Sequence, residues 1–211
     1  MDKIKYFRNM PVRAKIENIK MRLGYKKDIT ILDRVHREEL EKGIEKGFAL
    51  CQPSGAFGRF RIEEHFPDYI VLESGQALKS KSLAQLLKDS NEVVLMASTV
   101  GKRIVETIIS EIEEGDASLA VILDSVASQT ADAGLAWIVR YINQQLAREG
   151  KILTKHRYSP GYGDLHLFNQ KILFDLLKLE QLELALTEKY MLVPEKSVIA
   201  IAGVERIEKY E

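Results

Sequence analysis

The chain has 211 residues, 45% of them hydrophobic, and its 31 basic residues balance 31 acidic ones. A chain of this size buries roughly 70% of the surface that its unfolded form exposes, so disorder is excluded as its main state. With zero net charge, the chain has no excess of basic residues of the kind that proteins use to bind nucleic acid or an anionic membrane. We therefore expect neither partner.

A single cysteine, Cys51, permits neither an internal disulfide nor a thiolate zinc cage, which favours a reducing compartment, and the cytoplasm is the expected location. The N-terminus is charged, and no apolar run exceeds the length of Leu119 to Leu123, so we predict no signal peptide and no membrane span. No repeat, linker or low-complexity stretch divides the chain. We therefore expect one domain over residues 1–211, with the first 25 or so residues as an extension of it.

Hydrophobic periodicity predicts the elements in chain order. Helices are expected at 31–50, at 82–88, between Gly101 and Gly115, at 119–149 and at 165–179. Strands are expected at 57–63, 69–73, 92–97, 152–157, 182–186 and 198–202, the first two as an antiparallel pair. The span 119–149 is either the longest helix of the fold or two helices with a kink near Gly134. Asp164 is the expected N-cap of the helix at 165–179.

The predicted helices outnumber the strands, which come as neighbours at both ends of the chain and do not alternate strictly with helices. This arrangement predicts the α+β class. The sequence lacks the glycine-rich turn of a dinucleotide site, the phosphate loop of nucleotide hydrolases, the zinc helix of metalloproteases and the nucleophile elbow of esterases. His156, Ser159 and Asp164 lie within nine residues and cannot be expected to align as a hydrolase triad. We predict no catalytic nucleophile or base and no metal site.

Residues 156–164 form the densest group of polar and turn-forming residues. Pro160 fixes one φ angle and Gly161 permits a positive φ at the next position, the pattern of a type II turn, so the loop has one preferred shape. Arg157 offers a planar fork for a carboxylate or phosphate, and Tyr162 offers a ring face and a hydroxyl. The alternative is a plain turn between a strand and a helix, capped by the aspartate that ends it, with the arginine in a surface ion pair.

Three other places are candidates for a site. Residues 186–198 read as a loop between two strands, either structural or part of a site. Residues 98–101 (Ser-Thr-Val-Gly) lie between a strand and a helix, where free amides could bind an anion or a Ser or Thr could simply cap the helix. Asp132 lies among small residues on the long helix, facing either a cleft or solvent.

Two motifs and two shorter segments occur in a fixed order. The motifs are Arg-x-x-x-Gly-Tyr at 157–162 and Leu-Thr-Glu-(x)5-Pro-(x)2-Ser-Val at 186–198, and the segments 98–101 and 123–127 precede them. Together, over roughly residues 30–203, they resemble the activation domain of cobalamin-dependent methionine synthase, which binds S-adenosylmethionine.

The resemblance implies a twisted, largely antiparallel sheet with surrounding helices, and a site that holds S-adenosylmethionine while a cobalamin domain docks opposite. In that family, cob(II)alamin takes one electron from a flavodoxin-like donor and a methyl group from S-adenosylmethionine. No general acid or base is needed, because the methyl group leaves a sulfonium as a neutral thioether. The protein contributes proximity and orientation.

The resemblance also assigns roles to residues of this chain. Arg157 would bind the methionine carboxylate, and Tyr162 would line the pocket. Backbone groups at Ser159 and Gly161 would meet the adenosine part. Asp132, in place of the family's helix glutamate, would accept a hydrogen bond from the ligand. The large family members add contacts from an earlier segment and from an aromatic residue after the Ser-Val pair, which this chain lacks, so we expect a weaker affinity or a different ligand.

The chain is too short to hold the homocysteine, folate and cobalamin modules of those large enzymes, so we expect it to act in trans. The leading hypothesis is an accessory subunit with no turnover alone, which serves a corrinoid methyltransferase, most simply a methionine synthase that lacks an activation domain. The cobalamin would be carried by that partner. The alternative is a non-catalytic module that senses S-adenosylmethionine or a related nucleotide and regulates a partner.

Overall fold

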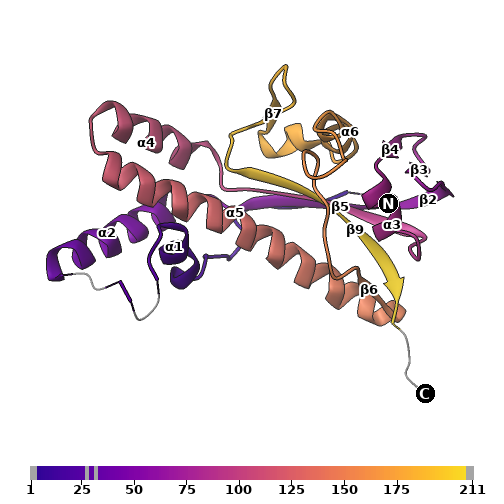
Figure 1. Ribbon diagram of the computed structural model, residues 1–211, viewed down its shortest axis with the longest axis horizontal. Coiled ribbons are helices and arrows are strands. Elements are labelled where there is room, and N and C mark those ends of the chain that lie inside the picture. The colour runs from indigo at the N-terminus through magenta and orange to yellow at the C-terminus, as the bar shows by residue number, and fades with distance from the viewer. Residues whose placement is uncertain (1–3, 27–28, 31–32, 208–211) are drawn as a thin grey trace.

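A computed structural model describes residues 4–26, 29–30 and 33–207, and its central feature is a seven-stranded sheet (Figure 1). The strand order is β4-β3-β2-β5-β9-β6, β1 also pairs with β2, and every neighbouring pair is antiparallel. The strands are β1 (Ile4–Phe7), β2 (Ser54–His65), β3 (Tyr69–Leu72), β4 (Ala77–Lys79), β5 (Glu92–Thr99), β6 (Lys151–Leu153) and β9 (Ser197–Arg206). A separate hairpin is formed by β7 (Ala185–Leu186) and β8 (Leu192–Val193).

Helices surround the sheet and extend beyond one end of it (Figure 1). They are α1 (Ile16–Arg22), α2 (Arg34–Leu50), α3 (Lys81–Leu86), α4 (Lys102–Glu113), α5 (Ala117–Leu146) and α6 (Asn169–Leu176), with 3-10 turns η1 (Ala147–Glu149) and η2 (Leu179–Leu182). The long α5 contacts the sheet and also packs against α1, α2 and α4. Within the described ranges, no helix combines the length and the apolar composition that a bilayer span requires.

The sheet separates two apolar layers, because successive residues of its central strands point to opposite faces. On one face, Val94 and Met96 of β5 pack against α5 together with Ala200 and Ala202 of β9. On the other face, Leu95 and its neighbours pack against the layer that contains α3 and α6. Alanines on the α5 side of β9 leave room for the helix, so α5 lies directly against the strand.

The helix α5 runs through Gly134 without a break, so the alternative of a single long helix is confirmed. A Cβ atom on Gly134 would lie 3.1 Å from Cε of Met10 and 3.3 Å from Cβ of Ser98. Contacts this short show that the helix passes close over β5 at this point. The glycine therefore permits close packing and does not introduce a kink.

The strands β2 and β3 form the antiparallel pair that the sequence predicts. Other boundaries were predicted wrongly. The strand expected at 152–157 ends at Leu153. Beyond it, the amide of Thr154 still donates to the carbonyl of Gly203 in β9, and an isolated bridge joins Tyr158 to the same strand. The strand expected at 182–186 is confined to β7, because η2 occupies the residues before it. The helix expected from residue 31 is α2, and the predicted start at residues 31 and 32 lies outside the described residues.

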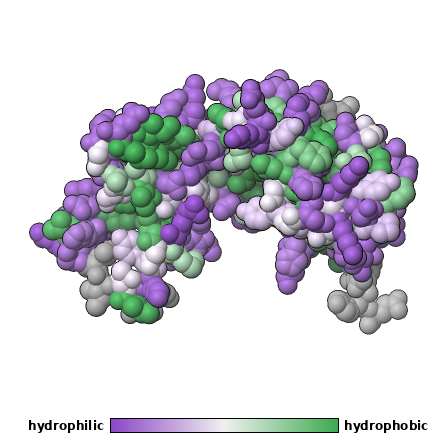
Figure 2. Space-filling model, turned by 45° about the horizontal axis from the view of Figure 1, so that its top comes forward, coloured by the Kyte–Doolittle hydropathy of each residue, from purple (hydrophilic) through white to green (hydrophobic). Residues whose placement is uncertain are grey.

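Residues near the N-terminus pack on the sheet and on α5. The strand β1 pairs with β2, and the ring of Phe7 lies 5.0 Å from the rings of both Trp137 and Tyr141, measured between centroids. The amide of Met10 donates to the carbonyl of Pro53 at 2.8 Å. The surface is hollowed between the lobe that carries α2 and α4 and the lobe that carries the sheet (Figure 2).

Candidate functional site

The loop after β6 has the shape that its sequence predicts. The amide of Tyr162 donates to the carbonyl of Ser159 at 3.2 Å across Pro160 and Gly161, and Gly161 has φ +92°, as a type II turn requires. The amide of Gly161 also donates to the carbonyl of Leu165 at 2.8 Å. These backbone bonds define the turn before any ligand is considered.

Asp164 anchors the loop to α3. Its carboxylate accepts hydrogen bonds from the hydroxyl of Ser80 (2.7 Å) and from the amides of Lys81 (2.7 Å) and Ser82 (3.2 Å). The prediction that it caps the helix at 165–179 is therefore wrong, and α6 begins only at Asn169, without a side-chain cap. The first amides of α3, which have no partner within the helix, lie beside the loop and donate their hydrogen bonds to this carboxylate.

The hydrogen bond from Ser80, with further bonds from Ser82 and Lys81, holds the pKa of Asp164 well below its usual range despite some desolvation. A lowered folded-state pKa stabilises the fold above the unfolded pKa of about 3.9, and this stabilisation is lost as the pH falls through that region. We expect Asp164→Ala to lower the melting temperature at pH 6, and the difference from wild type to shrink below about pH 4. Melting curves between pH 3 and pH 7 measure both, and a constant difference across that range would contradict the assigned anchor.

The second motif forms the β7–β8 hairpin and the turn that leads into β9. The hydroxyl of Ser197 lies 2.7 Å from the carbonyl of Pro194 and 2.8 Å from the hydroxyl of Thr99 in β5. The ammonium of Lys196, which is largely buried, pairs with Asp124 of α5 at 2.5 Å. The turn is thus fixed to both β5 and α5.

The loop, the hairpin and α5 enclose a cavity of about 530 Å³, which we call the loop pocket. The residues that line it are Asp132 and Leu135 of α5, Arg157, Tyr158, Ser159, Pro160, Tyr162, Leu167 and Gln170 of the loop and α6, Met191 and Leu192 of the hairpin, and Glu195, Ser197, Val198, Ile199 and Ala200 of the turn and β9. The predicted site residues Asp132, Arg157, Ser159 and Tyr162 are therefore brought together. Gly161 sits in the turn between two lining residues.

Three charged residues line the loop pocket, namely the predicted Asp132 and Arg157 and, from the turn before β9, Glu195. Desolvation raises the pKa of Asp132, and the positive charges of Arg157 and Arg22 partly offset this effect. Asp132 is nevertheless exposed. It lines the pocket, as one expectation has it, and it also contacts solvent, as the other has it. A carboxylate and a guanidinium in one cavity can bind the opposite charges of a zwitterionic ligand.

Gln170 and Glu195 also line the pocket; Gln170 is absent from the residues predicted for the site, and Glu195 was predicted only as part of the candidate segment 186–198. Gln170 is 8% exposed, and its amide donates to the carbonyl of Tyr190 at 2.6 Å, which ties α6 to the hairpin. The sequence feature that could have identified it is a polar residue on the same side of the helix as the buried Leu173 and Leu177. Glu195 occupies an unassigned position of the second motif, and no sequence signal distinguished it from a surface turn residue.

The positive φ of Gly161 gives a testable result. A Cβ atom there would lie 3.2 Å from Cδ1 of Leu167, and any side chain would be strained by about 1 kcal/mol or more. We expect Gly161→Ala to lose ligand affinity in the loop pocket and to lower thermal stability only modestly. Calorimetric titration and a melting curve on the same sample measure both, and a strong loss of stability with normal binding would show that the turn has only a structural role.

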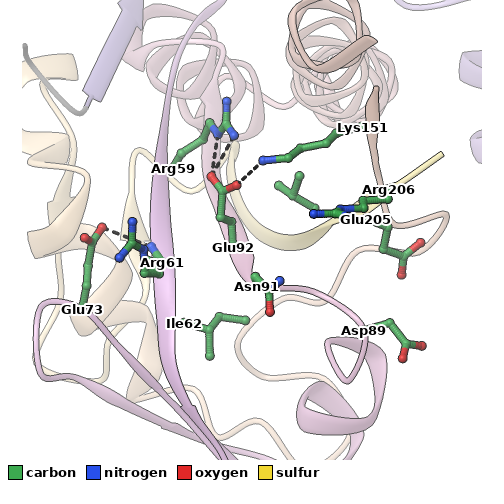
Figure 3. A pocket seen from close by; sticks show the side chains of 11 residues that line it. Arg59, Arg61, Ile62, Glu73, Asp89, Asn91, Glu92, Lys151, Glu205 and Arg206 are labelled. Carbon is green, nitrogen blue, oxygen red and sulfur yellow. Dashed lines mark hydrogen bonds and ion pairs between the residues drawn. The ribbon is translucent and has the colours of Figure 1, made fainter. Parts of the chain in front are cut away.

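A second hollow, of about 900 Å³, lies where β2, β5, β6 and the end of β9 meet (Figure 3). Arg59 and Lys151 both donate to Glu92, and Arg59 also donates to Glu149 at 2.6 Å. Desolvation raises the pKa of Glu92, but the bonds from Lys151 and Arg59 outweigh it and leave the pKa below its usual value. These charges satisfy one another, so we assign the network a structural role.

Two further sequence features that could carry chemistry are Cys51 and the segment 98–101. Desolvation raises the pKa of Cys51 to about 11, against a lowering effect of the nearby Thr130 hydroxyl, so its thiol stays protonated near neutral pH. At residues 98–101, Gly101 is the N-cap residue of α4 and no side chain caps the helix, so the predicted Ser or Thr cap is wrong. Thr99 instead accepts a bond from the amide of Gly101 at 3.2 Å.

No protein-family model and no curated protein matches the sequence. Among solved structures, the chain is similar to the "MetH Reactivation Domain bound to AdoHcy", with a TM-score of 0.66 and 15% identity, over 99% of this chain and 80% of that chain. A likeness at this identity establishes the fold and leaves the activity to be argued from the site. The predicted α+β fold, with a twisted, largely antiparallel sheet and surrounding helices, is confirmed, and the chain has the fold of the methionine synthase reactivation domain.

Proposed function

We propose that the loop pocket binds S-adenosylmethionine, and that the protein presents it for reductive methylation of cob(II)alamin on a separate corrinoid methyltransferase. One observation carries this proposal. The preformed loop at 157–162, the turn before β9 and Asp132 of α5 meet in one cavity, in a fold shared with a domain that has been solved with AdoHcy bound. The cavity volume of about 530 Å³ lies within the range of small-molecule sites.

Each predicted residue has a role that its position supports. The guanidinium of Arg157 would hold the carboxylate of the methionine part, and Asp132 would accept a hydrogen bond from its ammonium group. The turn at Ser159 and Gly161 would offer backbone groups to adenosine, and the exposed ring of Tyr162 would cover it. On β9 the wall consists of the four residues 197–200, none of them aromatic, so the aromatic contact absent from the sequence is not replaced from this strand.

The role of the site would be to orient the ligand, because the proposed methyl transfer needs no general acid or base. A one-electron donor of the flavodoxin type would reduce the partner's cobalt, which then takes the methyl group while the carbon–sulfur electron pair stays on sulfur. The sulfonium becomes the neutral thioether of S-adenosylhomocysteine, and no proton moves. The contribution of this chain is to hold the methyl group toward an incoming partner and to limit competing geometries.

Isothermal titration with S-adenosylmethionine tests the binding step, and we expect saturable one-to-one binding. The second step is tested with a cobalamin-dependent methionine synthase that lacks its reactivation domain, in the cob(II)alamin state, and a chemical one-electron reductant. We expect stoichiometric methylation of cobalt only when this chain, S-adenosylmethionine and the reductant are all present. Binding without methylation would favour the sensing module, and methyl transfer by this chain alone to a small molecule would overturn the proposal.

A further inference from the structure

A groove of about 650 Å³ continues from the loop pocket along the exposed side of α5. It shares Asp132 and Arg157 with that pocket, and its other wall is the segment from Pro11 to Asn18. We call it the cationic groove, after its basic residues Arg13, Lys15, Arg140 and Arg157. Of the described residues that line it, Asp132 is the only acidic one.

This concentration of positive charge is local, because the whole chain is neutral. Arg13 lies 3.5 Å from Glu45 and stacks over the ring of Phe48. Among the described residues, the side chains of Lys15 and Arg140 have no hydrogen-bond or ion-pair partner, and both residues are exposed. In the 900 Å³ hollow, Arg59 and Lys151 are instead paired with carboxylates. The groove therefore presents positive charge to whatever approaches it.

The position of the cationic groove beside the loop pocket indicates which partner would contact its charges. Because the groove and the loop pocket share two exposed residues, a protein that covers the mouth of the pocket also lies across the groove. The basic side chains are long and solvent-exposed and come from separate segments, which fits the broad, hydrated contact of a transient protein interface. We propose that the cationic groove docks an acidic face of the protein that brings the methyl acceptor to the pocket. This inference rests on the proposed function.

The test compares two charge reversals in the methylation assay described above. The variant Lys15→Glu/Arg140→Glu alters the groove, and Lys79→Glu/Arg148→Glu makes the same change in net charge at exposed positions that line neither cavity. At low salt we expect the groove variant to react with the corrinoid protein at least about tenfold more slowly at subsaturating concentration, since steering of this kind acts on the association rate. The difference should shrink toward about 1 M salt, where charges are screened within about 3 Å.

Titration with S-adenosylmethionine separates this inference from the proposed function. We expect the groove variant to bind S-adenosylmethionine within about threefold of wild type, because neither substituted residue lines the loop pocket. Equal methylation rates in the groove variant and wild type, at every salt concentration, would overturn the docking assignment alone. A wild-type protein that binds no S-adenosylmethionine, or that methylates no cobalt, would overturn the proposed function and the docking assignment with it.

Discussion

Arg157→Ala is expected to weaken S-adenosylmethionine binding about 10- to 150-fold, which corresponds to about 1.5–3 kcal/mol for a hydrogen bond to a charged group. The arginine lines the loop pocket, and it makes no hydrogen bond within the described part of the chain. Its guanidinium is therefore available to a ligand carboxylate. For the same reason, the substitution should leave the melting temperature nearly unchanged. Isothermal titration beside a melting curve measures both quantities.

The conservative substitution separates geometry from charge. Arg157→Lys keeps the positive charge but loses the planar fork, so we expect it to recover only part of the lost affinity. Arg148→Ala, an exposed arginine just past α5 that lines neither cavity, is the matched control and should bind like wild type. Unchanged affinity in folded Arg157→Ala would reject the carboxylate assignment.

The sequence predicts the parts of this fold whose signal is local. The turn at Pro160 and Gly161 is an example, because two adjacent residues fix its backbone angles. The strand β5 is another, since a continuous apolar run is what burial on both faces produces. Both occur in the structure as expected.

The wrong predictions concern contacts between segments distant in sequence. Asp164 looked like the cap of the next helix because sequence shows only neighbours along the chain. Its real donors are the amides of α3, more than 80 residues earlier. Gln170 was missed for a related reason, because its hydrogen bond to Tyr190 forms only when α6 and the hairpin are packed together. The structure also shows why the two motifs are useful only in combination, since each supplies a different wall of the loop pocket.

Gly134→Leu is expected to destabilise the protein by about 3 kcal/mol, because overpacking of a close helix–sheet contact forces the backbone to move. A Cβ atom at this position would contact Cε of Met10 and the side chain of Ser98, whose hydroxyl oxygen would be the nearest atom. For a domain of this size, the melting temperature should fall by about 2–4 °C for each kcal/mol lost. Gln144→Leu, at an exposed position of the same helix, should change it little.

The same substitution connects packing to the site, since Asp132 lies two residues earlier on α5. Displacement of the helix from β5 should move its carboxylate away from the wall formed by β9, so the affinity of the loop pocket should fall together with stability. Gly134→Ala should be milder, because alanine gains about 1 kcal/mol of helix propensity that offsets the contact. Adding Ser98→Ala removes the oxygen nearest to the new Cβ and should restore both stability and binding in Gly134→Ala. If the double variant stays as unstable as Gly134→Ala or becomes less stable, contact with Ser98 is not the cause, and the assigned role of Gly134 in positioning α5 is wrong.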